Sequence, residues 1–350
     1  MKKYICLFIM SLSLIVNCSD TLVPPANYND TEYTLKILNL ETLSLITSYE
    51  INWNHGTMAF RDQNKKLYLN ASYSIYEHYS EKLLDLETGA LTKYDSTVVS
   101  YPEDSIRIYR DYSHYYVFNR NTGKTSKILR SHYRNNVLDY SKCTATLYYS
   151  INDSLFSIKI DSTENRFLAK IPGNNMIVYG KLISENDQDI SLLCTVVDEY
   201  KFIVYKNDLS TGSFARMFST LIPSYHLQKN INLSSSENNN NLLFKGYCGN
   251  NFELFSIPLN GGKKTRITHT DQHETHAQYL PDGRILFLAG ENEDFNFYWV
   301  NDSQLDLYIM NAVGSNSQKI AENVSTNYAI SEDGTRLAYI EQKLQDIDND

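Results

Sequence analysis

The sequence predicts an all-β fold built from repeated four-stranded antiparallel units. Two kinds of β-hairpin alternate along most of the 350 residues, and each kind has its own turn chemistry. Aromatic residues, which favour strands, are abundant, with 28 tyrosines among them. A net charge of −9 argues against nucleic acid or an anionic membrane surface as the partner. We therefore expect one large β domain in the folded part of the chain.

The first kind of hairpin joins two apolar strands through a polar turn that usually carries Gly or Asn. Both residues tolerate the positive φ angle that tight hairpin turns require. The copies of this hairpin are found near residues 38–46, 84–94, 118–123, 207–212, 257–262 and 309–314, with a weaker copy near 158–161.

The second kind of hairpin has an acidic residue followed by Gly in its turn. Its clearest copies are Pro281-Asp282-Gly283 and Glu332-Asp333-Gly334. In the first copy Pro fixes φ at the start of the turn, and in both Gly takes the left-handed position. Weaker copies are found near residues 57–70, 96–109, 137–150, 178–195 and 227–247. The last contains the polar tract Ser234 to Asn241, which we interpret as a turn with a tolerated surface insertion.

Seven hairpins of each kind can be placed, which predicts a seven-bladed β-propeller over residues 32–342. Six or eight blades also fit, because the middle copies are weak. The chain begins with a hairpin of the first kind, near 33–46, and ends with one of the second kind, near 327–340. We expect these two halves to form one blade, closed by strands from both termini, because closure removes exposed sheet edges.

The last two hairpin pairs resemble the TolB-type, WD40-like propeller repeat. That repeat has a Pro-Asp-Gly turn before an apolar strand, and then Leu-Tyr-x-Met-Asn-x-x-Gly-Ser, which Leu307 to Ser315 match. The resemblance covers about residues 250–340. It implies four-stranded antiparallel blades around a central channel, but it does not imply one function.

The N-terminus has the features of a secretion signal. Lys2 and Lys3 precede an apolar run, residues 4–16, that is too short to span a bilayer. The run ends in Ile15-Val16-Asn17-Cys18, which resembles a bacterial lipobox and implies lipid attachment at Cys18. We therefore expect a lipoprotein signal peptide (1–17), a flexible tether (18–31) and an acidic tail (343–350), with the protein secreted across the inner membrane and lipid-anchored in the cell envelope. An ordinary cleaved signal peptide with a chance cysteine is the alternative.

The eight histidines all map to one predicted face of the propeller, where connections between blades and between the two middle strands of a blade meet. The residues expected at this ligand-binding face are His55, His132, His226, Glu274, Tyr298 and Trp299. The densest group is His269, His273 and His276, and His and carboxylate side chains suit a divalent transition metal such as Mn or Zn. The alternative is that these are polar loop histidines satisfied by water and backbone.

A second resemblance gives an enzymatic alternative. Oligogalacturonate lyases are seven-bladed propellers whose histidines bind a central metal, and His273-Glu274-Thr275-His276 before a Pro-Asp-Gly turn is similar in type. This resemblance implies a metal-dependent polysaccharide lyase. The sequence has no Gly-x-Ser-x-Gly, Walker or dinucleotide motif. It favours a non-enzymatic module that binds an envelope protein, peptide or glycan and contacts the membrane only through its lipid.

Overall fold

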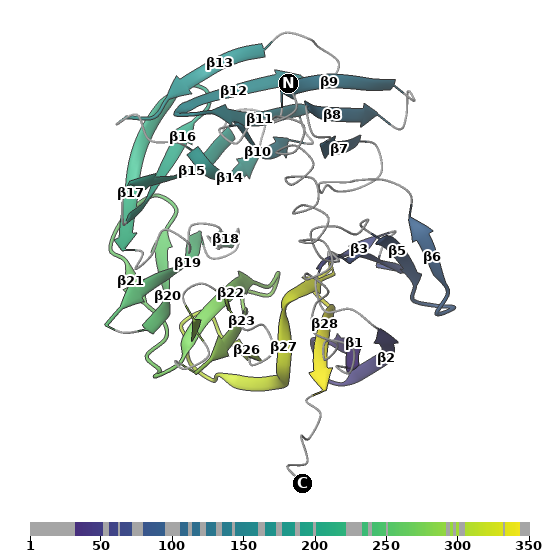
Figure 1. Ribbon diagram of the computed structural model, residues 1–350. Coiled ribbons are helices and arrows are strands. Elements are labelled where there is room, and N and C mark those ends of the chain that lie inside the picture. Colours follow the sequence, from purple (N-terminus) through teal and green to yellow (C-terminus); the bar gives the residue numbers. More distant parts are fainter. Residues whose placement is uncertain are drawn as a thin grey trace, which may run out of the picture.

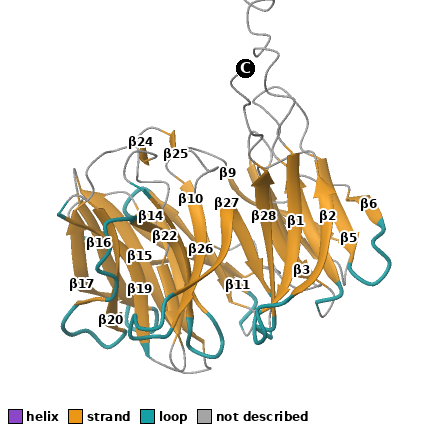
Figure 2. Cartoon of the chain, turned by 90° about the horizontal axis from the view of Figure 1, so that it is seen from below, coloured by secondary structure: helices purple, strands orange, loops and turns teal. Residues whose placement is uncertain are grey.

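A computed structural model describes the following parts of the chain: residues 32–51, 56–61, 64–71, 80–94, 106–110, 114–119, 124–130, 135–141, 144–159, 165–172, 177–185, 190–198, 201–221, 233–236, 240–249, 251–291, 295–296, 299–300, 305–331 and 333–343. These residues form 28 β-strands and no helix, as Figure 2 shows. The all-β class and the four-stranded antiparallel sheets predicted from the hairpins are confirmed. No helix in this part of the chain is long and apolar enough to cross a membrane.

Four sheets have four strands each, in chain order from one edge to the other. The first contains β3 (Gly56–Arg61), β4 (Lys66–Ala71), β5 (Ser80–Asp85) and β6 (Leu91–Tyr94). The second contains β10 (Asn135–Ser141), β11 (Thr146–Ile151), β12 (Ser154–Lys159) and β13 (Asn165–Lys170). The third contains β14 (Ile177–Glu185), β15 (Ile190–Asp198), β16 (Lys201–Asp208) and β17 (Ser213–Leu221). The fourth contains β18 (Leu233–Ser236), β19 (Asn241–Cys248), β20 (Asn251–Pro258) and β21 (Thr265–Arg266).

Two smaller sheets complete the middle of the chain. One has three described strands, β7 (Ile106–Arg110), β8 (His114–Asn119) and β9 (Lys124–Arg130). The other is a short hairpin of β24 (Phe295–Asn296) and β25 (Trp299–Val300).

The largest sheet joins the two ends of the chain. Its order is β2 (Leu45–Ile51), β1 (Glu32–Asn39), β28 (Arg336–Lys343), β27 (Gln318–Ile330), β26 (Leu305–Met310), β23 (Ile285–Gly290) and β22 (His273–Tyr279). The 13-residue β27 pairs with β26 through its first half and with β28 through its second. It therefore belongs to two successive four-stranded units. The N-terminal β1 pairs with the C-terminal β28 along its whole length, and Figure 1 shows the two side by side.

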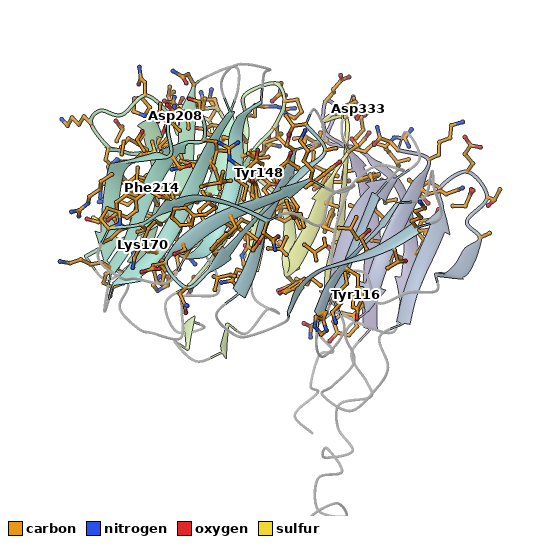
Figure 3. All side chains as sticks on the ribbon, turned by 90° about the horizontal axis from the view of Figure 1, so that it is seen from above. Tyr116, Tyr148, Lys170, Asp208, Phe214 and Asp333 are labelled. Atoms are coloured by element: carbon orange, nitrogen blue, oxygen red, sulfur yellow. The ribbon has the colours of Figure 1, made fainter. Side chains whose placement is uncertain are left out.

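The sheets are arranged around a common centre. In Figure 1, β10, β14, β18 and β22 lie on the inner sides of their sheets, and β6, β13, β17 and β21 lie on the outer sides. The hairpin turns gather at one face: Figure 3 places Asp208, from the turn between β16 and β17, and Asp333, from the turn between β27 and β28, at the same edge. Because each strand runs from one face to the other, the remaining connections lie at the opposite face, where Figure 2 shows β24 and β25.

Apolar side chains pack between neighbouring sheets. In β15, Leu192 packs with Leu138 and Tyr148 of the preceding sheet, whereas the adjacent Leu193 packs with Phe244 of the following sheet. All these side chains are buried. Successive residues of a strand point to opposite faces, so each sheet contributes to two cores. This packing holds β15 between the two neighbouring sheets.

One local prediction was wrong. The tract that begins at Ser234 does not form an insertion, because Ser234 to Ser236 pair with β19 as strand β18. Ser234 is buried, and its Oγ accepts a hydrogen bond of 2.9 Å from the main-chain N–H of Tyr279. A small hydroxyl thus connects this sheet to β22.

Candidate functional site

The candidate site is centred on β22, an inner strand that is irregular in the middle. Its pairing with β23 shifts register between Thr275 and Gln278, which indicates a β-bulge. Within this bulge His276 has a φ of 49°, a left-handed conformation that is uncommon for residues other than Gly and that costs free energy. Bulges and strained residues are frequent at functional sites. Strand β22 begins at His273, three residues before His276.

Tyr328, in the second half of β27, belongs to the following four-stranded unit and contacts the bulge. The Tyr328 hydroxyl donates a short hydrogen bond to the main-chain carbonyl of His276. Burial raises the pKa of Tyr328 well above its usual value, so the phenol stays neutral and remains a donor. The contact stabilises a backbone conformation that the His276 side chain alone would disfavour.

The His276 ring lies next to a hydroxyl and a cation. Its Nδ1 is 3.2 Å from Thr275 Oγ1, and its pKa is lowered to about 4, first by burial and then by the charge of Lys245. The ring is therefore neutral at physiological pH. Thr275 Oγ1 also accepts a hydrogen bond of 3.4 Å from Lys245 Nζ, so the hydroxyl stands between the amine and the imidazole.

Lys245 comes from β19 of the preceding sheet. Its Nζ lies 4.9 Å from the centre of the Phe252 ring, and burial lowers its pKa to about 8. Lysines with a pKa lowered by desolvation occur at binding and catalytic sites. Among the ion pairs of the described residues, none joins Lys245 to a carboxylate.

A buried acidic pair lies behind this cluster. Glu253 of β20 forms an ion pair with Arg266 and accepts a hydrogen bond of 2.7 Å from Thr268 Oγ1. Glu274 accepts a short hydrogen bond from Thr270 Oγ1, and its Oε2 has no hydrogen-bond partner. Burial, with a smaller contribution from the charge of Glu253, raises the pKa of Glu274 to about 7. The sequence predicted Glu274 at the ligand-binding face; its side chain is fully buried and contacts Thr270 of the connection from β21 to β22, and a role in ligand binding stays a prediction.

The three predicted metal ligands do not form a group. His269 is exposed in the connection, and His273 is buried, with its Nδ1 accepting a hydrogen bond of 3.0 Å from the main-chain N–H of Phe252. No three His, Cys, Asp or Glu side chains of the described residues are placed to hold a metal ion. Metal binding therefore stays a prediction that would need ligands from elsewhere in the chain.

The other predicted site residues are only partly placed. Trp299 lies in β25, within the connection expected at the ligand-binding face. Outside the described residues lie Cys18, His55, His132, His226 and Tyr298.

Sequence reasoning missed Lys245, Tyr328 and Glu253. A lysine within the apolar run Leu242-Leu243-Phe244-Lys245-Gly246 is a signal that could have been noticed, because an unpaired charge is rarely placed in a buried strand. Tyr328 carries no such signal, since it is one of 28 tyrosines.

Comparisons with solved structures identify the fold. A protein described as TolB from Agrobacterium tumefaciens matches with a TM-score of 0.54 and 13% identity over 90% of this chain and 100% of that one. The chain is a β-propeller. Dipeptidyl peptidase 4 from Porphyromonas gingivalis matches this propeller with a TM-score of 0.52 and 10% identity over 83% of this chain and 50% of that one.

An oligogalacturonate lyase in complex with manganese gives a TM-score of 0.41 and 11% identity over 81% of this propeller and 69% of that chain, which is too distant to carry an argument about chemistry. No family model and no curated protein matches the propeller. At these identities the likeness to TolB and to the peptidase concerns the fold alone.

Proposed function

We propose that this propeller is a non-catalytic binding module that presents its connection face to a protein, peptide or glycan of the cell envelope. The observation that carries the proposal is the cluster on β19, β22 and β27, where strands of three successive units bring Lys245, Thr275, His276 and Tyr328 together. In propellers the inner strands surround a central channel, where ligands have access. A rigid scaffold with polar groups at its centre suits recognition.

We further propose seven blades, with the sheet of β1, β2, β27 and β28 as the blade that closes the ring. Three described sheet features support this count: four separate four-stranded sheets, one three-stranded sheet, and a seven-stranded sheet that contains two units sharing β27. A deletion that removes β28 tests closure. It would leave β1 paired with β2 alone and would remove the partner of the second half of β27. We expect it to abolish cooperative unfolding; a folded and monomeric product would contradict closure.

Lipid anchorage at Cys18 belongs to the same proposal. The lipobox-like sequence supports it. Metabolic labelling with an alkyne fatty acid should mark the parent chain and leave Cys18→Ala unlabelled. Equal labelling of both would contradict the anchor, and with it the expected location in the envelope.

The binding role is tested by placing a photo-crosslinking residue at one of two exposed acidic positions. Asp271 lies in the connection from β21 to β22, at the proposed binding face, and Glu87 lies in the turn between β5 and β6, at the opposite face. We expect a discrete crosslinked product in intact cells from position 271 only, and we expect an excess of unlabelled propeller to compete it away. Equal products from both positions, or none from position 271, would refute the proposal.

A further inference from the structure

Lys245 lies just beyond the point where β18, the innermost strand of its sheet, stops pairing with β19. Strand β18 pairs with β19 only from Asn241 to Phe244. Lys245 is the next residue of β19, and its Nζ contacts Thr275 of β22 instead. Lys245 lies midway along β19, and its amine reaches Thr275, the third residue of β22, a strand that begins at the connection face.

The groups around the Lys245 amine are donors or uncharged. Thr275 Oγ1 accepts one of its three N–H groups, and the Phe252 ring lies beneath the charge. His276 is neutral, and its ring nitrogen is directed at the same hydroxyl. The Tyr328 phenol is occupied as a donor to the His276 carbonyl.

The nearby carboxylates do not neutralise Lys245. Glu253 is engaged by Arg266 and Thr268, and Glu274 is engaged by Thr270. Desolvation is the cause of the lowered pKa of Lys245. A part-buried, desolvated ammonium that has no counter-ion among the described residues is unfavourable, and an oxyanion that accepts its remaining N–H groups would relieve that cost.

We propose that Lys245 and Thr275 form a binding site for one oxyanionic group, a carboxylate or a phosphate, on a ligand that enters at the connection face. The ammonium supplies the charge. With the His276 proton on Nδ1, the ring donates to Thr275 Oγ1, and the Thr275 hydroxyl proton is free to be donated to the ligand. The identity of the natural ligand rests on the proposed binding function, but occupation of the site by a small anion does not.

The test measures the reactivity of each lysine with trace acetic anhydride across pH 6 to 10, read by mass spectrometry on the full-length protein. Acetate, inorganic phosphate and chloride are compared at equal ionic strength. Lys264 is the matched control, because its Nζ also lies over an aromatic ring, 4.5 Å from the centre of Phe255, and the residue is exposed. We expect acetate or phosphate to raise the midpoint of the curve of Lys245 reactivity against pH by about one pH unit, and the shift should saturate with anion concentration. Chloride should not shift the Lys245 midpoint, and no salt should shift the midpoint of Lys264.

The pH dependence of anion affinity gives a second readout. Above about pH 8 the free amine loses its proton, so affinity should fall tenfold for each pH unit. In this range His276 is neutral, Glu274 is already ionised and Tyr328 remains protonated, so Lys245 is the group that titrates in the cluster.

Two variants complete the experiment. Thr275→Val should weaken anion binding at least tenfold, and Thr275→Ser, which keeps the hydroxyl, should bind as the parent does. A shift with acetate alone identifies a carboxylate site, and a shift with phosphate alone identifies a phosphate site. Equal shifts with chloride, or none with any salt, would overturn the proposal. If acetate or phosphate binds at Lys245 but no crosslinked partner forms at position 271, the anion site stands and only the proposed binding function is contradicted.

Discussion

The Tyr328 hydroxyl donates a hydrogen bond to the main-chain carbonyl of His276, and this bond connects the inner strands of two successive units. His276 is the strained residue of the bulge in β22, with a φ of 49°. The bond therefore stabilises the conformation that places the Thr275 hydroxyl between the His276 ring and Lys245. The site and the packing of neighbouring sheets depend on each other at this point.

Removing this hydroxyl should destabilise the protein measurably. Tyr328→Phe keeps the ring but leaves a part-buried carbonyl without its donor, which costs about 1–3 kcal/mol. We expect the midpoint of urea unfolding to fall while the m-value stays constant. Tyr49→Phe, in the outer strand β2, serves as the comparison. An equal loss in both variants would show that the effect is not specific to the bulge.

Glu274 should make stability fall as pH rises. Its pKa is about 7 in the folded protein against 4.5 for the free side chain, so the unfolded chain loses its proton first. Below pH 4.5 Glu274 is protonated in both states and does not lower the free energy of unfolding. Between pH 4.5 and 7 the free energy of unfolding falls as pH rises, and above pH 7 the contribution of Glu274 is constant. A shift of this size corresponds to about 3 kcal/mol.

Glu274→Gln removes this titration without changing the shape of the side chain. The variant should gain stability relative to the parent by up to about 3 kcal/mol between pH 4.5 and 7, as measured by urea unfolding at several pH values. The difference between the two proteins is the quantity to follow, because His276, with a pKa lowered to about 4, acts in the opposite direction over part of this range. Glu41→Gln, at an exposed turn, is the charge-matched control. A difference that does not change with pH would contradict the prediction.

The metal hypothesis can be decided by elemental analysis. His273 already accepts a hydrogen bond at Nδ1 and His269 lies exposed in the connection, so we expect the purified protein to hold far less than one Mn or Zn per chain. A double variant, His273→Ala with His276→Ala, should have the same metal content as the parent. Near-stoichiometric metal in the parent that the double variant loses would restore the enzymatic alternative.

The sequence predicts the strands well because their signals are local. Gly in a tight turn and apolar residues around it reveal a hairpin wherever they occur, which is why the all-β class and the four-stranded antiparallel sheets are confirmed in the described residues. The cluster could not be predicted in this way. Lys245 and Thr275 are 30 residues apart and lie on different sheets, so only the packing of those sheets reveals their contact. The burial of Glu274 has the same origin, because it depends on how the preceding connection covers β22.

The turn glycines provide a test of how closely neighbouring units pack. Gly314, in the turn between β26 and β27, has a φ of 84°, and a Cβ added there would lie 2.4 Å from the carbonyl oxygen of Ile267. Gly261 has a similar φ of 89°, but an added Cβ would meet no atom within 4 Å. Both positions strain a side chain through φ, but only Gly314 adds a collision with the backbone of the preceding unit.

Gly314→Ala should therefore lose more stability than Gly261→Ala. We expect about 1 kcal/mol from the left-handed backbone in either variant, and a further loss of about 1–3 kcal/mol at Gly314 because the two units must move apart. Thermal unfolding of both variants measures the difference directly. Equal melting temperatures would mean that the turn can shift away from Ile267 without loss, and that the turn face does not depend on close contact between successive units.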